Sequence, residues 1–94
     1  MNDLLQSNHA AILRIARKHG VKTICVFGSS ARNELRDDSD VDFLIEVDGP
    51  TSPWFPGGLV AELEQLLNRR VDVVEACALR EPLREIILKE AVPL

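Results

Sequence analysis

The stretch from residue 40 to residue 47, DVDFLIEV, constrains the fold of this chain more than any other stretch. Polar and apolar side chains alternate along it, which is the pattern of a β-strand with one buried face. The apolar members mark the core side, so the carboxylates of Asp40 and Asp42 point away from the core. Two such charges closing to ~4 Å would repel by about 4 kcal/mol at an effective dielectric near 20. A cation between them would relieve this repulsion, and Mg²⁺ typically binds one or two carboxylates together with substrate phosphates.

A Gly-Ser pair precedes this acid pair, and ten residues separate Ser29 from Asp40. The β-branched and apolar run before it predicts a buried strand over 22–28 that ends at Gly28. A glycine there lets a ligand approach the backbone, and the short helix predicted over 29–35 would offer free N–H groups to an anion. Each feature alone is common in turns and loops. Together they predict a unit that holds a polyphosphate at one end and its metal ions at the other.

The remaining segments predict an alternation of helices and strands. Apolar periodicity indicates helices over 3–19, 59–68 and 82–91, and an apolar run indicates a third strand over 71–75. Prolines and glycines predict a loop over 48–58. We therefore expect an α/β (α+β) fold, with a small mixed β-sheet of three to four strands and helices packed mainly on one face.

Size and composition indicate a single small domain over residues 1–94. The net charge of −4 argues against direct nucleic-acid binding, which normally uses a basic face. No apolar run approaches the ~18 residues of a membrane span, and the N-terminus lacks a secretory signal pattern. We therefore expect a cytoplasmic protein without a membrane partner. Cys25 and Cys77 lie far apart in the sequence, so neither a disulfide framework nor a zinc site is expected.

Two further positions each carry two interpretations. Asp72 interrupts an apolar strand, and an acid there is costly unless it lies at the strand's end, is paired or binds a metal. A salt bridge to Arg69 or Arg70 is the structural alternative to a functional role. Trp54, with Phe55, lies in the loop over 48–58. It would stack on a nucleotide base or dock on a partner, or both aromatics would fold back over the core.

The string Gly28-Ser29-Ser30-Ala31-Arg32, followed by Ser39-Asp40-Val41-Asp42, resembles the GS-x10-D-x-D motif of DNA polymerase beta-like nucleotidyltransferases. It is similar in particular to the minimal nucleotidyltransferase (MNT) family, and the ending LREIILKEAVPL resembles the tail of that family. The resemblance implies the nucleotidyltransferase fold, with a third acid on a strand after an intervening helix. It implies that the catalytic and metal-binding residues are Asp40, Asp42 and Asp72, and that the nucleotide-binding residues are Gly28, Ser29, Ser30 and Arg32. Arg32 would contact a phosphate or pin the acidic turn through a salt bridge.

The same resemblance implies a reaction and a partner. The three carboxylates would hold two Mg²⁺ ions, ATP would donate AMP, and pyrophosphate would leave. Ser29 would hold the β- and γ-phosphates, and Asp72 could also accept the proton of the attacking hydroxyl. MNT proteins commonly act as antitoxins of HEPN-type ribonuclease toxins, which implies a hetero-oligomer and a tyrosine hydroxyl of the toxin as acceptor. Two alternatives remain open: a non-catalytic antitoxin that acts by binding alone, and a sensor that binds ATP without transfer.

Overall fold

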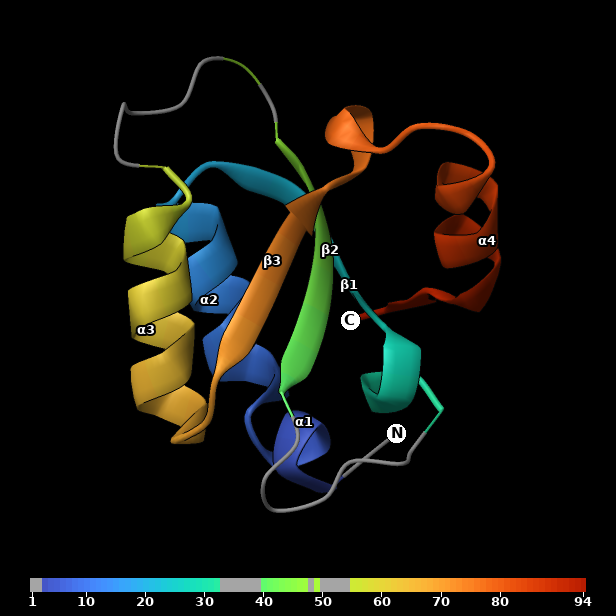
Figure 1. The fold of residues 1–94 in the computed structure, drawn as a ribbon. Helices are drawn as coiled ribbons and strands as arrows, with labels where there is room; N and C mark the ends of the chain where they lie inside the picture. Colours follow the sequence, from blue (N-terminus) through green and yellow to red (C-terminus); the bar gives the residue numbers. More distant parts are fainter. Residues whose placement is uncertain (1–2, 33–39, 48, 50–54) are drawn as a thin grey trace.

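The computed structural model describes residues 3–32, 40–47, 49 and 55–94. In this part of the chain, four strands form one mixed sheet in the order β3-β2-β1-β4 (Figure 1). The central strands β1 and β2 are antiparallel, β3 runs parallel to β2, and β4 is antiparallel to β1. The strand bounds are β1 (Val21–Phe27), β2 (Val41–Val47), β3 (Val71–Glu75) and β4 (Val92–Pro93). The arrangement confirms the predicted class of fold.

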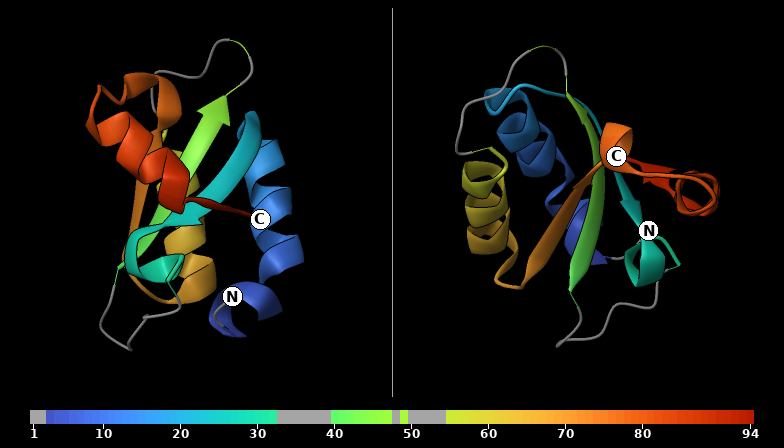
Figure 2. Two further views of the ribbon diagram at one scale, coloured as in Figure 1. Left: turned by 90° about the vertical axis from the view of Figure 1, so that its right-hand side faces the viewer. Right: turned by 45° about the horizontal axis from the view of Figure 1, so that its top comes forward.

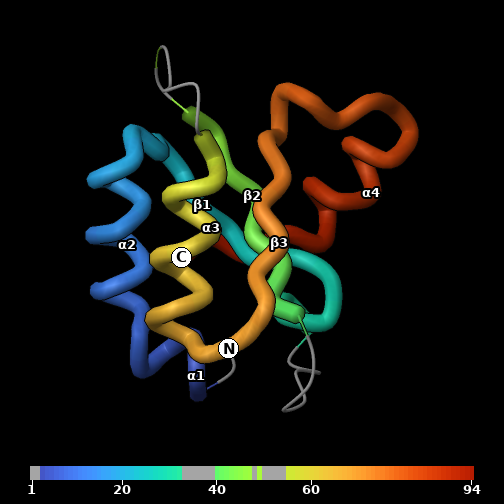
Figure 3. The backbone as a smooth tube through the Cα atoms, turned by 60° about the vertical axis from the view of Figure 1, so that its left-hand side comes forward, coloured from blue at the N-terminus to red at the C-terminus, as the bar shows by residue number. Residues whose placement is uncertain are grey.

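The long helices lie on one face of this sheet. Helices α2 and α3 stand side by side against it, and α4 lies on the opposite side (Figures 1 and 2). Figure 3 shows α1 continuing the layer of α2 at its lower end. None of the described helices is long and apolar enough to cross a membrane. The helices are α1 (Asp3–Ser7), α2 (His9–Lys18), α3 (Gly57–Leu67) and α4 (Leu83–Glu90), with short 3-10 turns η1 (Gly28–Ser30) and η2 (Ala76–Ala78).

The hydrophobic core lies between the sheet and the layer formed by α1, α2 and α3. The alternation in β2 produces it, because Val41, Phe43 and Ile45 face these helices and are fully buried. Every third or fourth residue of α3 meets them from the other side. Apolar side chains from α1, α2, β1 and β3 complete the cluster, whose fully buried members include Leu5, Ile12, Val26, Leu59 and Leu63.

Local differences from the predicted elements have identifiable causes. The predicted helix over 3–19 is two helices, because the Asn8 side chain donates a hydrogen bond to the Leu4 carbonyl at 2.8 Å and Asn8 becomes the residue before α2. Gly57 and Gly58 begin α3 rather than ending the loop. The two-residue strand β4 carries too short a pattern to be predicted.

Parts of the sequence predictions fall on residues outside the described ranges. The end of the helix predicted over 29–35 lies there, and its described part contains only the 3-10 turn η1. Trp54 also lies outside the described residues. Phe55 is half-buried against the core, which is the fold-back alternative for that aromatic.

Helix α4 differs from the other helices in that none of its residues is buried. The predicted apolar face includes Leu83 and Ile86, yet Leu83 is 53% exposed and Ile86 is 58% exposed. Its periodicity therefore describes a helix that lies over the open side of the sheet rather than one that fills the core.

Candidate active site

A tight turn joins β1 to the region of the acids, and Gly28 begins it. Gly28 has a φ of +64°, a left-handed conformation that side chains other than glycine rarely adopt. A Cβ atom at this position would lie 2.8 Å from Oδ2 of Asp42, too close for any other residue to fit without movement. The amides of Ala31 and Arg32 both donate to the Gly28 carbonyl, at 3.1 and 3.2 Å, and so close the turn. The backbone conformation favours glycine here, and any side chain would require the Asp42 carboxylate to move.

Two of the three predicted acids lie side by side on adjacent strands. β2 and β3 are parallel and in register, so that Asp42 is the partner of Asp72. Neighbouring strands are about 4.8 Å apart, and residues in register point to the same face. This face is the one turned away from the core. Asp40 immediately precedes β2 and is exposed, as is Asp72, whereas Asp42 is half-buried.

The charges of these acids act on one another. Burial raises the pKa of the Asp42 carboxyl, and the negative charges of Asp72, Asp40 and Glu90 raise it further, in that order. Asp42 is therefore the centre of a group of four carboxylates. A salt bridge to Arg69 or Arg70 stays the structural alternative to a functional role for Asp72.

Ser30 connects the turn to the strand that carries the acids. Its side chain is almost completely buried, with 1% exposed, and its hydroxyl accepts a hydrogen bond from the amide of Asp42 at 3.1 Å. A buried hydroxyl in this position fixes where β2 begins relative to the turn. Ser29, by contrast, is only half-buried. The two serines thus differ in surroundings, with Ser30 directed at the backbone of the acid strand.

Glu90, at the end of α4, is the site residue that the sequence reasoning did not single out. Its Oε1 accepts a hydrogen bond from the amide of Gly28 at 2.5 Å and lies 3.2 Å from Nη1 of Arg32. One signal in the sequence pointed to it. An acid in the last turn of a helix opposes the helix dipole, which favours basic residues there. Such a residue has a local cost that a contact elsewhere must offset, and here the contacts are with Gly28 and Arg32.

The number of acids at this site suits a Mg²⁺ ion that is also bound by the phosphates of the substrate. Among the described residues, no group of three or more His, Cys, Asp or Glu side chains forms a ready-made cage for a metal ion. The crowding around Asp42 is nevertheless the kind of negative field that a divalent cation relieves. Mg²⁺ usually keeps water and phosphate ligands and takes only one or two carboxylates from the protein. Asp42 and Asp72, with Asp40 beside them, provide that number.

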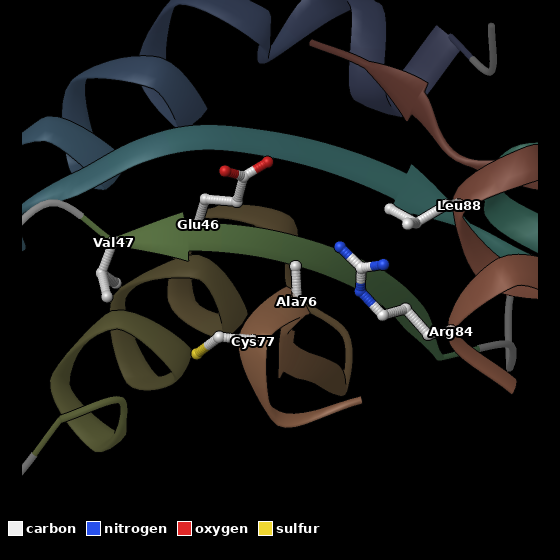
Figure 4. Close-up of a pocket in the computed structure, with 6 residues that line it drawn as sticks. All are labelled: Glu46, Val47, Ala76, Cys77, Arg84 and Leu88. Carbon is white, nitrogen blue, oxygen red and sulfur yellow. The ribbon is translucent and has the colours of Figure 1, made fainter. Parts of the chain in front are cut away.

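A separate hollow of about 320 Å³ lies farther along the same face of β2 (Figure 4). Glu46 reaches it from β2, and Arg84 and Leu88 reach it from α4. Glu46 is four positions beyond Asp42 on the strand, a span of roughly 13 Å. The hollow is therefore at the other end of the strand from the acids.

The chain matches known proteins over most of its length. Residues 10–94 match the nucleotidyltransferase domain family. A Methanocaldococcus jannaschii protein named as a protein adenylyltransferase is 42% identical over 81 residues, which are 86% of this chain and 87% of that protein. The protein adenylyltransferase MntA of Thermococcus cleftensis is 37% identical over 78 residues, 83% of this chain and 79% of the relative.

Solved structures share the fold. One described as a minimal nucleotidyltransferase has a TM-score of 0.88 and 39% identity, and the match covers 100% of this chain and 97% of that one. The MNT antitoxin in complex with a tri-AMPylated Shewanella oneidensis HEPN toxin has the same fold, with a TM-score of 0.71 and 19% identity over 94% of this chain and 69% of that chain. The chain therefore belongs to the nucleotidyltransferase domain family, within its minimal nucleotidyltransferase group, and adenylyltransferase is the class of enzyme that its sequence relatives assign to it.

Proposed function

We propose that this protein transfers AMP from ATP to a tyrosine hydroxyl of a HEPN-type toxin and thereby acts as its antitoxin. The observation that carries the proposal is the register of β2 and β3, which sets Asp42 beside Asp72 next to the Gly28 turn. The names of the sequence relatives support a protein as acceptor. The fold shared with an antitoxin bound to an AMPylated toxin supports the class of partner.

The proposal gives roles to the three predicted acids, to Gly28 and to Ser29. Asp40, Asp42 and Asp72 would hold two Mg²⁺ ions, which when bound supply positive charge to the phosphates and to the attacking oxygen. Gly28 leaves room at the turn for the phosphates, and Ser29 lies beside it to donate its hydroxyl to them. Asp72 is exposed and can accept the proton of the incoming hydroxyl as it attacks the α-phosphorus. Pyrophosphate leaves.

The acceptor has to be presented by another molecule in this proposal. The acids lie on the open face of the sheet, where Asp40 and Asp72 are exposed. A hydroxyl on a partner can therefore reach them without a change in the core. AMP on that hydroxyl would add charge and bulk to the toxin surface. Because ATP and ribonuclease targets are both found in the cytoplasm, we place the reaction there.

The test uses the purified chain, labelled ATP, Mg²⁺ and a purified HEPN-type toxin. We expect label on the partner with the wild type, and a loss of roughly 10³-fold with Asp42→Asn or Asp72→Asn, since each removes a charge worth several kcal/mol at a metal. Asp3→Asn, an exposed acid in α1, is the matched control and should transfer label normally.

Three outcomes separate the proposal from its alternatives. Absence of label in every reaction, with toxin still neutralised by Asp42→Asn, would indicate an antitoxin that acts by binding alone. Calorimetric binding of ATP without turnover or neutralisation would indicate a nucleotide sensor. Label on a residue other than tyrosine would retain the transferase and correct the acceptor.

A further inference from the structure

Glu90 occupies the position on the turn where an anion is expected. Its carboxylate oxygen accepts the Gly28 amide at 2.5 Å and lies 3.2 Å from the Arg32 guanidinium. A backbone N–H and a guanidinium together form the kind of pair that binds a phosphate oxygen. Both groups in the Gly28–Arg32 turn are therefore bound to a negatively charged group of the protein itself.

The surroundings of this carboxylate make its position conditional. Its charge raises the pKa of Asp42, so it lies in the same negative field as the acids. It would also lie 3.9 Å from a Cβ atom at Gly28, the space through which a ligand would approach the turn. A triphosphate on these donors and the Glu90 carboxylate would be like charges in contact. The two cannot share the turn at low energetic cost.

We propose that the Glu90 carboxylate occupies the triphosphate position of the Gly28–Arg32 turn in the nucleotide-free protein, and that the nucleotide has to displace it. Glu90 is thus an affinity-determining residue, acting as an internal competitor for the nucleotide. This inference rests on the proposed function for the identity of the ligand. It adds that the last turn of α4 responds to whether the site is filled, since Glu90 is the final residue of that helix.

A structural role for Glu90 makes the opposite prediction about affinity. If its carboxylate only holds the turn in shape, its removal loosens the turn and weakens nucleotide binding. If it competes with the nucleotide, its neutralisation strengthens binding. Glu90→Gln separates the two, because the amide oxygen can still accept the Gly28 amide while the charge is lost. Hydrogen bonds to charged groups exceed neutral ones by about 1 kcal/mol, which corresponds to roughly 5-fold in affinity.

The experiment measures binding of Mg-ATP, of inorganic triphosphate and of adenosine to the full chain by calorimetry. We expect Glu90→Gln to bind ATP and inorganic triphosphate about 3- to 10-fold more tightly than the wild type, with adenosine unchanged. Glu85→Gln is the matched control, since Glu85 lies on the exposed side of α4 and pairs only with Lys89 at 3.6 Å among the described residues. It should leave all three affinities unchanged.

A second measurement follows the turn directly. The Gly28 amide proton, hydrogen-bonded to a carboxylate in the nucleotide-free wild type, should move upfield in Glu90→Ala. Equal or weaker binding of ATP by Glu90→Gln, or tighter binding of ATP without tighter binding of triphosphate, overturns the inference. A wild type that binds ATP but never transfers AMP refutes the proposed function while this affinity difference still decides the role of Glu90. If neither wild type nor variants bind any phosphate ligand, both proposals are wrong.

Discussion

The two faces of the sheet contrast in composition and in packing. The face toward α2 and α3 is buried against these helices, and residues such as Phe43 and Leu63 are fully buried there. The opposite face carries Asp42 and Asp72 and is partly covered by α4, which buries none of its residues. The same strand supplies both faces by alternation. The difference teaches that this small chain concentrates its stability on one face, so that the other can tolerate crowded charge.

The largest loss of stability should come from a substitution in the hydrophobic core on the buried face. Leu63→Ala removes a fully buried side chain of α3 and should cost about 2–5 kcal/mol in the free energy of unfolding, because a cavity remains. Ile86→Ala, in the helix over the other face, is 58% exposed and should change it by less than about 0.5 kcal/mol. Urea denaturation of both variants measures the contrast. Similar losses for the two would mean that α4 is as tightly packed as α3.

A substitution at Gly28 tests whether the turn on the open face tolerates a side chain. Gly28→Ala places a Cβ atom 2.8 Å from the Asp42 carboxylate at a φ of +64°. We expect a loss of about 1–3 kcal/mol in unfolding free energy and a marked loss of ATP binding, because the strained backbone and the carboxylate both have to move. Gly49→Ala is the control, since its φ is +88° but none of the described residues has an atom within 4 Å of the added one. It carries the backbone strain without the clash, so nucleotide binding should be affected only by Gly28→Ala.

The smallest effect concerns the stability that the protein loses by placing the ionised Asp42 carboxylate among other acids. The pKa of Asp42 is raised in the folded protein, so its ionised form lowers stability above that pKa, and the penalty fades as the pH falls toward and below the ordinary value of 3.8. Asp42→Asn should therefore raise the melting temperature by about 2–4 °C near neutral pH, and this gain should vanish at about pH 4 or below. Thermal unfolding with a chelator present measures it. A gain that grows as the pH falls would show that the sign of the shift is wrong.

The sequence predicted the strands more fully than it predicted the site. Alternation over 40–47 placed Phe43 and Ile45 in the core. The short run over 71–75 was predicted as a strand from its apolar, β-branched residues. Pattern alone could not show that β2 and β3 pair in register, since strand order and register depend on packing between distant segments. The family resemblance implied that Asp72 lies with Asp40 and Asp42, and the pairing of β2 with β3 places it next to Asp42.

Glu90 shows where sequence reasoning stops. In the sequence, Glu90 is one of several charged residues of a predicted amphipathic helix. In the structure it contacts Gly28 and Arg32, which are distant in the sequence. The break in the first predicted helix at Asn8 was missed because of a local contact instead. A side-chain hydrogen bond there overrides the periodic apolar pattern. The catalytic roles of Asp40, Asp42 and Asp72 remain predictions that the transfer assay decides.

The hydrogen bond between Gly28 and Glu90 joins residues 62 positions apart. Closing a loop of that length has an entropic cost that local contacts in the hairpin of β1 and β2 do not carry. The hairpin of β1 and β2 can therefore form before this bond, whereas the bond requires α4 to reach the turn. In a rapid-mixing experiment, recovery of the Gly28 amide environment should lag behind formation of the β1–β2 hairpin, so that the turn spends part of refolding without its Glu90 partner.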